Sequence, residues 1–195
     1  MENYIQKALD YPSYIKLLEE LMEQGKTTGE NQSAEMLNYA KLNLARIHRL
    51  EKTTEILPEL KSLIEKINKT YTWLIITEGW CGDAAQNITP LYFMSLLNPN
   101  IKVALVLRDE NLELMDRYLT NGGRSIPKLI CLDEQLNEVF TWGPRPQAAQ
   151  ALVKELLANK ASLEEKSLAS QKWYNADKTV SLQNEFFELI NKYMN

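Results

Sequence analysis

The chain has 195 residues, of which 45% are hydrophobic, and its net charge of −4 corresponds to an isoelectric point near 5.2. This length suits one domain with substantial additions, and the acidic balance provides no basic surface for nucleic acid. The first residues lack the apolar core of a signal peptide and no apolar run reaches transmembrane length, so we expect a cytoplasmic protein that binds neither nucleic acid nor a membrane.

The N-terminal 69 residues are predicted to form a helical segment. Asp10 can cap its first helix, and apolar residues recur behind it at helical spacing. Two further helices are expected over residues 33–50 and 58–67, after a turn at residues 25–31. Their apolar faces cannot fully cover one another, so we expect these helices to pack on the sheet that follows.

Alternating strands and helices are predicted from residue 70 to residue 158. The expected strands cover residues 71–77, 101–107, 126–132 and 137–142, and the expected helices cover residues 82–97, 111–120 and 145–158. A helix joins the first two strands, so these should be parallel, with their carboxyl ends at one edge of the sheet. The last two strands should be antiparallel.

Two more helices are expected after this core, over residues 161–174 and 179–193. They should either complete the fold or form the interface of a homodimer. No flexible linker separates these parts, so we expect residues 1–195 to form a single α/β domain with helical additions at both ends.

One short stretch, residues 73–84, combines a buried strand, a glycine-flanked turn and the start of a helix. Cys81 lies where the turn meets the helix, so unpaired backbone N–H groups and the positive end of the helix dipole would favour its thiolate. We therefore expect an exposed, reactive thiol at Cys81. The alternative is a small buried hydrophobic residue, the commoner environment of a lone cysteine.

Two segments carry a resemblance to a known family. Glu78–Ala84 (EGWCGDA) resembles the Trp-Cys-Gly-Pro-Cys turn of the thioredoxin family, and Ser125–Ile130 (SIPKLI) resembles its Ile-Pro-Thr segment. The resemblance covers residues 70–158 and implies a thioredoxin-like fold, with a four-stranded mixed sheet flanked by helices. It also implies that Cys81 is the nucleophile and that Pro127 is cis and faces it.

Two positions depart from the family motif. Asp83 stands where proline is usual, and Ala84 stands where the family has its second cysteine. The charge of Asp83 would raise the pKa of the Cys81 thiol, against the effect of the helix end. The buried carboxylate of the family corresponds here to Ile75. Only half of a Cys-x-x-Cys redox pair is therefore present, and no second thiol is placed to resolve a mixed disulfide.

Eight residues are expected to form the substrate-binding surface around the thiol: Trp80, Gly82, Asp83, Arg108, Arg124, Ser125, Ile126 and Pro127. A cis Pro127 would present the backbone of Ile126 to an extended substrate. Trp80 would form a flat apolar wall over the thiol, unless it belongs to the core.

Two arginines have two interpretations each. Arg124 should lie within reach of Cys81, where it could stabilise a thiolate or hold the carboxylate of a ligand such as glutathione. Its alternative is a solvated arginine of a loop. Arg108 could act in the same way, or could pair with Asp109 or Glu110.

The remaining cysteine and the histidine predict no further chemistry. Cys131 lies about 13 Å along its strand from Pro127, at about 3.3 Å per residue, and is expected in the core. His48 is the only histidine and falls on a helix surface. One histidine and two separated cysteines cannot form a zinc site, so we expect no metal site and no bound cofactor.

These observations predict a thioredoxin-family protein that performs thiol–disulfide exchange with a single thiol, as an oxidoreductase or isomerase lacking the resolving cysteine, in cell redox homeostasis. Its expected partners are protein thiols and disulfides, or glutathione. The main alternative is a redox-inactive binding module that holds a peptide or small thiol between Trp80 and Pro127. A cluster-binding monothiol glutaredoxin is a more distant comparison, because its Cys-Gly-Phe-Ser motif differs from the Cys-Gly-Asp-Ala found here.

Overall fold

The computed structural model describes residues 1–194. Its centre is a four-stranded sheet in the order β2-β1-β3-β4. The strands are β1 (Tyr71–Thr77), β2 (Ile101–Leu107), β3 (Lys128–Leu132) and β4 (Glu138–Trp142). β1 pairs in parallel with β2, whereas β3 is antiparallel to both β1 and β4. This mixed sheet, flanked by helices, confirms the predicted thioredoxin-like α/β fold.

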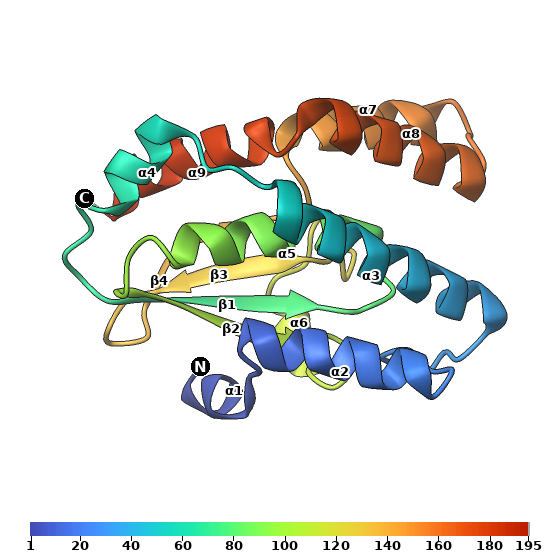
Figure 1. The fold of residues 1–195 in the computed structure, drawn as a ribbon, viewed down its shortest axis with the longest axis horizontal. Helices are drawn as coiled ribbons and strands as arrows, with labels where there is room; N and C mark the ends of the chain where they lie inside the picture. Colours follow the sequence, from blue (N-terminus) through green and yellow to red (C-terminus); the bar gives the residue numbers. More distant parts are fainter. Residues whose placement is uncertain (195) are drawn as a thin grey trace.

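Helices lie on both sides of the strands (Figure 1). They are α1 (Glu2–Lys7), α2 (Tyr11–Glu23), α3 (Ala34–Thr53), α4 (Pro58–Ile64), α5 (Gly82–Ser95), α6 (Leu112–Met115), α7 (Gln147–Ala158), α8 (Leu163–Asp177) and α9 (Val180–Tyr193). In the view of Figure 1, α3 and α5 lie above the strands, and α1 and α2 lie below them.

The N-terminal segment is attached to the sheet by its backbone as well as by its helices. The Asp10 side chain accepts a hydrogen bond from the Ser13 N–H at 2.8 Å, which confirms it as the cap of α2. Leu9 and Leu105 exchange two backbone hydrogen bonds of 2.8 Å, so the segment before α2 covers the exposed edge of β2. α1 and α2 pack on β2, which confirms the expected contact with the sheet, whereas α3 packs mainly on α5, so the expectation is wrong for this helix.

The predicted helix over residues 111–120 is wrong in length, because α6 ends at Met115. Beyond it, the Arg117 and Tyr118 N–H groups bond to carbonyls three residues earlier, and two hydrogen bonds between Thr120 and Gly123 close a turn. The predicted strand over residues 126–132 begins two residues later, at Lys128, since Pro127 has no N–H group for the ladder.

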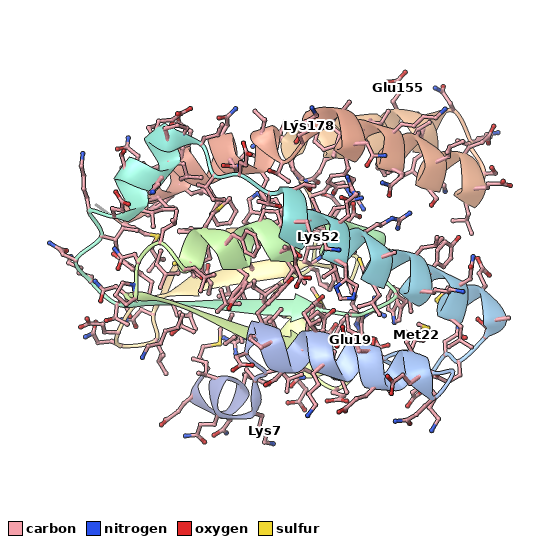
Figure 2. All side chains as sticks on the ribbon, in the orientation of Figure 1. Lys7, Glu19, Met22, Lys52, Glu155 and Lys178 are labelled. Carbon is pink, nitrogen blue, oxygen red and sulfur yellow. The ribbon has the colours of Figure 1, made fainter. Side chains whose placement is uncertain are left out.

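The core lies between the sheet and its helices. Trp73 of β1 is fully buried and makes an edge-to-face contact with Phe186 of α9, with ring centroids 5.2 Å apart. Phe186 also contacts Phe140 and Trp142 of β4, so α9 completes the core of the fold. Charged side chains such as Lys7, Glu155 and Lys178 point outward (Figure 2). Across residues 1–194, none of the helices combines the length and the apolar character needed to cross a membrane.

Candidate active site

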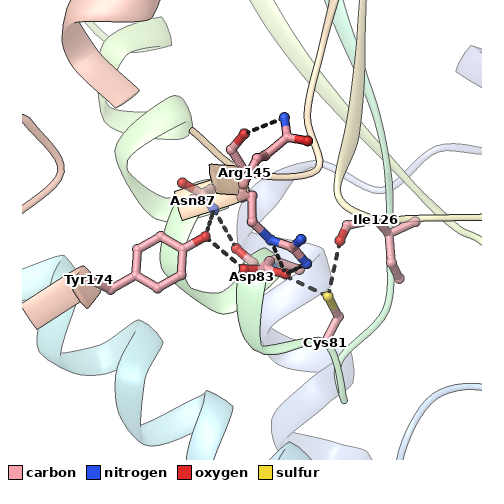
Figure 3. A network of polar contacts seen from close by, with 8 residues as sticks. Cys81, Asp83, Asn87, Ile126, Arg145 and Tyr174 are labelled. Carbon is pink, nitrogen blue, oxygen red and sulfur yellow. Dashed lines mark hydrogen bonds and ion pairs between the residues drawn. The ribbon is translucent and has the colours of Figure 1, made fainter. Parts of the chain in front are cut away.

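Cys81 lies at the junction between β1 and α5, as the sequence pattern predicts. It is the N-cap residue of α5, and its Sγ accepts a hydrogen bond from the Ala84 N–H at 3.5 Å. The thiol donates in turn to the carbonyl oxygen of Ile126, with Sγ and O 3.3 Å apart (Figure 3). Sequence-distant segments therefore meet at this sulfur, and one of them is the loop that contains Pro127.

The expectation that Cys81 is exposed is wrong. The residue is only 9% exposed and belongs to the same buried cluster as Tyr14 of α2. Burial raises the pKa of the Cys81 thiol to about 12, and the negative charge of Asp83 adds to this rise. The backbone N–H groups at the start of α5 and the guanidinium of Arg145 lower the pKa by less. At rest the thiol is therefore protonated at neutral pH.

Asp83 is the centre of a polar network beside the thiol (Figure 3). Arg145 donates to Asp83 Oδ2 through Nε, at 3.0 Å, and also through Nη2. The hydroxyl of Tyr174 donates to Asp83 Oδ1 at 2.7 Å and accepts from Asn87 Nδ2 at 3.0 Å. Burial, followed by the Asp83 charge, raises the pKa of Tyr174, which keeps this hydroxyl protonated.

This network joins α5 to the loop before α7 and to α8. Asp83 and Arg145 are largely buried, with side-chain exposures of 15% and 22%, so their ion pair is only weakly screened by solvent. Sequence reasoning included Asp83 in the site but missed Arg145, Asn87 and Tyr174. The one sequence signal was the position of Arg145 between two prolines, in a segment that had been interpreted only as a helix start.

The position of Arg145 depends on Gly143. The Ile126–Pro127 peptide bond is cis, which confirms that prediction, and the Gly143–Pro144 bond is cis as well. Gly143 crosses directly over Pro127 with a φ of +115°, and a Cβ built on it would overlap the Pro127 carbonyl oxygen. Only glycine fits such a close approach at this φ. The crossing brings the loop before α7 to the same end of the sheet as Cys81.

Trp80 and Arg108 occupy the other side of the turn. The Arg108 guanidinium carbon lies 4.7 Å from the centroid of the Trp80 ring, and its Nε donates to Asp109 Oδ1 at 2.8 Å. Pairing with Asp109 was one of the two interpretations of Arg108 and is confirmed. The turn at Gly29 reaches this place too, since a Cβ on Gly29 would lie 3.4 Å from Trp80 Nε1. Trp80 is therefore held between Arg108 and the N-terminal segment.

Arg124 is engaged elsewhere. Its Nε and Nη2 donate to the two carboxylate oxygens of Asp116, at 2.6 and 2.8 Å, in a pair that is about half exposed. Its carbonyl oxygen accepts from Arg108 Nη1 at 3.4 Å. Among residues 1–194, the arginine that pairs beside the thiol is Arg145 and not Arg124. Ser125 follows on the loop to Pro127 and lines a shallow hollow together with Arg145.

Three other positions considered for the chemistry of the site, Cys131, Ile75 and Glu78, are fully buried. Cys131 is fully buried in β3, as predicted, and both cysteines are free thiols. Ile75, the position of the family carboxylate, is a buried core residue. Sequence reasoning assigned no role to Glu78, which is fully buried; its Oε1 accepts from the Asp109 N–H at 2.9 Å, and burial raises its pKa. Within residues 1–194, no group of His, Cys, Asp and Glu side chains is arranged to hold a metal ion.

Comparisons with known proteins agree with the fold. A family model described as thioredoxin matches residues 29–162. Two solved structures resemble the fold over nearly its whole length. A Pseudomonas aeruginosa protein of unknown function is 19% identical, with a TM-score of 0.64 and coverage of 97% of this chain and 95% of that one. An HIV epitope scaffold is 18% identical, with a TM-score of 0.58 and coverage of 94% and 99%. No curated protein gives a match to this sequence.

Proposed function

Because this chain belongs to the thioredoxin family, we propose that it performs thiol–disulfide exchange through the single thiol of Cys81. The observation that carries the proposal is the position of Cys81 Sγ, at the N-cap of α5 and 3.3 Å from the Ile126 carbonyl, next to the cis bond of Pro127. In this position the thiol lies beside a stretch of backbone with which an extended substrate can pair. This arrangement supports the proposed exchange.

The proposed exchange needs no second cysteine in this chain. The Cys81 thiolate attacks one sulfur of a disulfide R–S–S–R′, so that a Cys81–S–S–R bond forms while the substrate S–S bond breaks. R′–S⁻ leaves with the electron pair and takes up a proton from solvent, which has received the Cys81 proton. A thiolate from glutathione or a partner protein then attacks the sulfur of R, forms a new disulfide and releases the Cys81 thiolate.

The resting state of the site limits the rate of this exchange. With a thiol pKa of about 12, on the order of one molecule in 10⁵ carries a thiolate at pH 7. Two groups that lower the pKa of the thiol, the Ala84 N–H and the Arg145 guanidinium, already lie beside it. A partner that exposed the thiol to solvent would remove the largest cause of the shift, burial. We therefore propose a slow thiol that its partner activates.

The proposal is tested by incubating the folded protein at pH 8 with glutathione disulfide and measuring mixed disulfides by intact mass. The expected adduct forms on the wild-type chain and on Cys131→Ser, but not on Cys81→Ser, which is the matched control for the same fold. An adduct that forms only in urea would overturn the proposal, because the thiol would then be inaccessible in the native protein.

The second candidate is a redox-inactive binding module that uses the same surface for a peptide or a small thiol. It is favoured by the 9% exposure of Cys81 and by Ala84 in place of a second cysteine. The two candidates differ in what Cys81→Ser does to a captured partner. Under the exchange proposal, Cys81→Ser no longer forms a disulfide-linked complex with the partner on non-reducing gels. Under the binding-module alternative, Cys81→Ser binds the partner with unchanged affinity.

A further inference from the structure

A hollow of about 310 Å³ lies next to the network around Asp83, between the first turn of α5 and helices α3, α7 and α8. We call it the α5–α8 hollow; its lining includes Arg46, Asp83, Arg145, Leu157, Leu163 and Lys166. Figure 1 shows α7 and α8 side by side above α3 and α5. Its volume is at the lower end of the range that holds small-molecule ligands.

The charges around the hollow are unbalanced. Three cationic side chains line it, from Arg46, Arg145 and Lys166, and one anionic side chain, that of Asp83. Asp83 is already engaged by Arg145 and by the Tyr174 hydroxyl. The protein as a whole has a net charge of −4, so a local excess of positive charge stands out against the rest of the surface. An anion would complement it.

Two of the cations have no anionic partner. Arg46 Nη1 donates to the amide oxygen of Asn43 at 2.7 Å, and it also lies over Gly82, 3.5 Å from the place of a Cβ on that residue. Over residues 1–194, neither Arg46 nor Lys166 has a carboxylate within ion-pair distance. Both are partly buried, so each has lost some hydration without gaining a counter-ion. Burial lowers the pKa of Arg46, which an anion would reverse.

Part of the lining of the hollow is apolar. It consists of Val153 and Leu157 from α7 and Leu163 from the start of α8. Leu157 is 57% exposed and Leu163 is 70% exposed, so both present apolar surface to solvent at the hollow. A ligand with a short apolar chain would remove this surface from water, at about 25 cal/mol per Å².

We propose that the α5–α8 hollow binds a small organic anion, which has a carboxylate or phosphate group at one end and a short apolar chain at the other. The anionic group contacts Arg46 and Lys166, and the chain lies against Leu157 and Leu163. The shared chemistry is a negative oxygen group on an apolar body of modest size. This site involves no atom of Cys81 and goes beyond the proposed exchange reaction.

The test uses three probes that share one chain length: hexanoate, hexyl phosphate and 1-hexanol. Binding is followed by amide chemical shifts in ¹⁵N-labelled protein at low ionic strength. We expect saturable binding of at least one of the two anions, with shifts centred on the first turn of α5 and on α8, and weaker binding of the alcohol by about tenfold, the effect of one charge-assisted hydrogen bond. Equal binding of all three probes would overturn the proposal.

Matched variants separate this site from general surface charge. Arg46→Gln and Lys166→Gln should each weaken anion binding by about tenfold. Lys52→Gln and Lys172→Gln each remove one positive charge from the same two helices, but these residues are exposed and do not line the hollow, so both variants should bind as the wild type does. Equal losses in all four variants would refute the site.

A further pair of measurements defines the ligand. Hexanoate and hexyl phosphate distinguish a carboxylate ligand from a phosphate ester, and tight binding of either supports the proposal. Cys81→Ser should bind both anions unchanged, since the thiol does not line the hollow. Loss of binding in Cys81→Ser, with the fold intact by circular dichroism, would contradict the separation of this site from the exchange reaction.

Discussion

The two thiols of this protein are both buried, but in very different surroundings. Burial raises the pKa of both Cys81 and Cys131 to about 12. Cys131 lies in the middle of β3, opposite Trp73 of β1 and Phe140 of β4. Cys81 lies at the end of the sheet, where side chains and loops cover it. One thiol is therefore buried by the sheet itself, and the other by side chains and loops at the end of the sheet.

The groups around each sulfur support the same distinction. Near Cys81, the Ala84 N–H and the Arg145 guanidinium favour the thiolate, and Asp83 opposes it. These contributions partly cancel, so a change in any of them should move the pKa. At Cys131, burial is again the largest cause; a hydrogen bond with Trp73 lowers the pKa and the charge of Asp133 raises it. The two thiols therefore differ less in the causes of their pKa shifts than in what covers them, because Cys131 is exposed only when its strand leaves the sheet.

The largest expected difference is in the accessibility of the two thiols. Iodoacetamide should reach Cys131 only after global unfolding, which slows its alkylation by roughly 10³-fold or more relative to the denatured chain. Cys81 needs only a local opening of its cover and should react much faster. Single-cysteine variants, Cys131→Ser and Cys81→Ser, report each rate separately by mass spectrometry. Equal protection of the two thiols would remove the distinction between them.

The alkylation rates of Cys81 and Cys131 should also depend differently on pH. For a thiol with a pKa of about 12, the thiolate fraction rises about tenfold with each unit increase in pH, as long as the pH is below the pKa. Alkylation of Cys81 should therefore keep rising through pH 10. Cys131 should react from the unfolded chain, with an ordinary thiol pKa of about 8.5, and its rate should level off above this pH. A plateau for Cys81 near pH 8.5 would mean that its local opening hydrates the thiol as fully as unfolding does and returns its pKa to the ordinary value.

Removing the opposing charge should activate Cys81 alone. In Asp83→Asn the second cause of the raised pKa is lost, and Arg145 is left to act on the thiolate, so alkylation of Cys81 at pH 8 should rise by about tenfold, the effect of one pKa unit. The charge-assisted hydrogen bonds to Arg145 and Tyr174 are weakened, which should lower the free energy of unfolding by roughly 2 to 3 kcal/mol.

The control for this variant is Asp116→Asn, which breaks an exposed Asp–Arg pair of similar geometry. Exposed ion pairs contribute little to stability, so both the free energy of unfolding and the alkylation rate of Cys81 should stay close to those of the wild type. The measurements are urea unfolding and the alkylation rate in the Cys131→Ser background. An unchanged rate in Asp83→Asn would show that burial alone determines the acidity of Cys81.

Local patterns predicted the fold well. The apolar run before Cys81 and the apolar residues of the next strand are the buried β1 and β2, and their helical connection made the pair parallel. The cap at Asp10 was also local information. The prediction failed at α6, where the helix ended earlier than the pattern suggested because a turn between Thr120 and Gly123 competed with it.

The candidate site was harder to predict because its decisive contacts are long-range. The motif placed Cys81 and Pro127 together, which depends on the family resemblance and the order of strands. Burial of Cys81 involves a cluster that extends to Tyr14, and no spacing in the sequence relates these residues. Arg145 reaches Asp83 only because Gly143 crosses Pro127. Arg124, nearer to Pro127 in sequence, was the more obvious choice but is held by Asp116.

The smallest expected effect concerns Tyr174, the contact between α8 and the thiol network. Tyr174→Phe removes one hydroxyl that donates to Asp83 and accepts from Asn87, while the ring keeps its packing. The free energy of unfolding should fall by about 1.5 kcal/mol, the lower end of the net value of a hydrogen bond to a charged group. The carboxylate of Asp83 then has one donor fewer and attracts Arg145 more strongly, so less of the guanidinium charge favours the Cys81 thiolate.

Alkylation of Cys81 should change by less than about threefold, whereas that of Cys131 should follow only the change in global stability. If Cys81 instead became as reactive as a free cysteine, α8 would be the main cover of the thiol, and the local opening that distinguishes the two cysteines would be the departure of that helix.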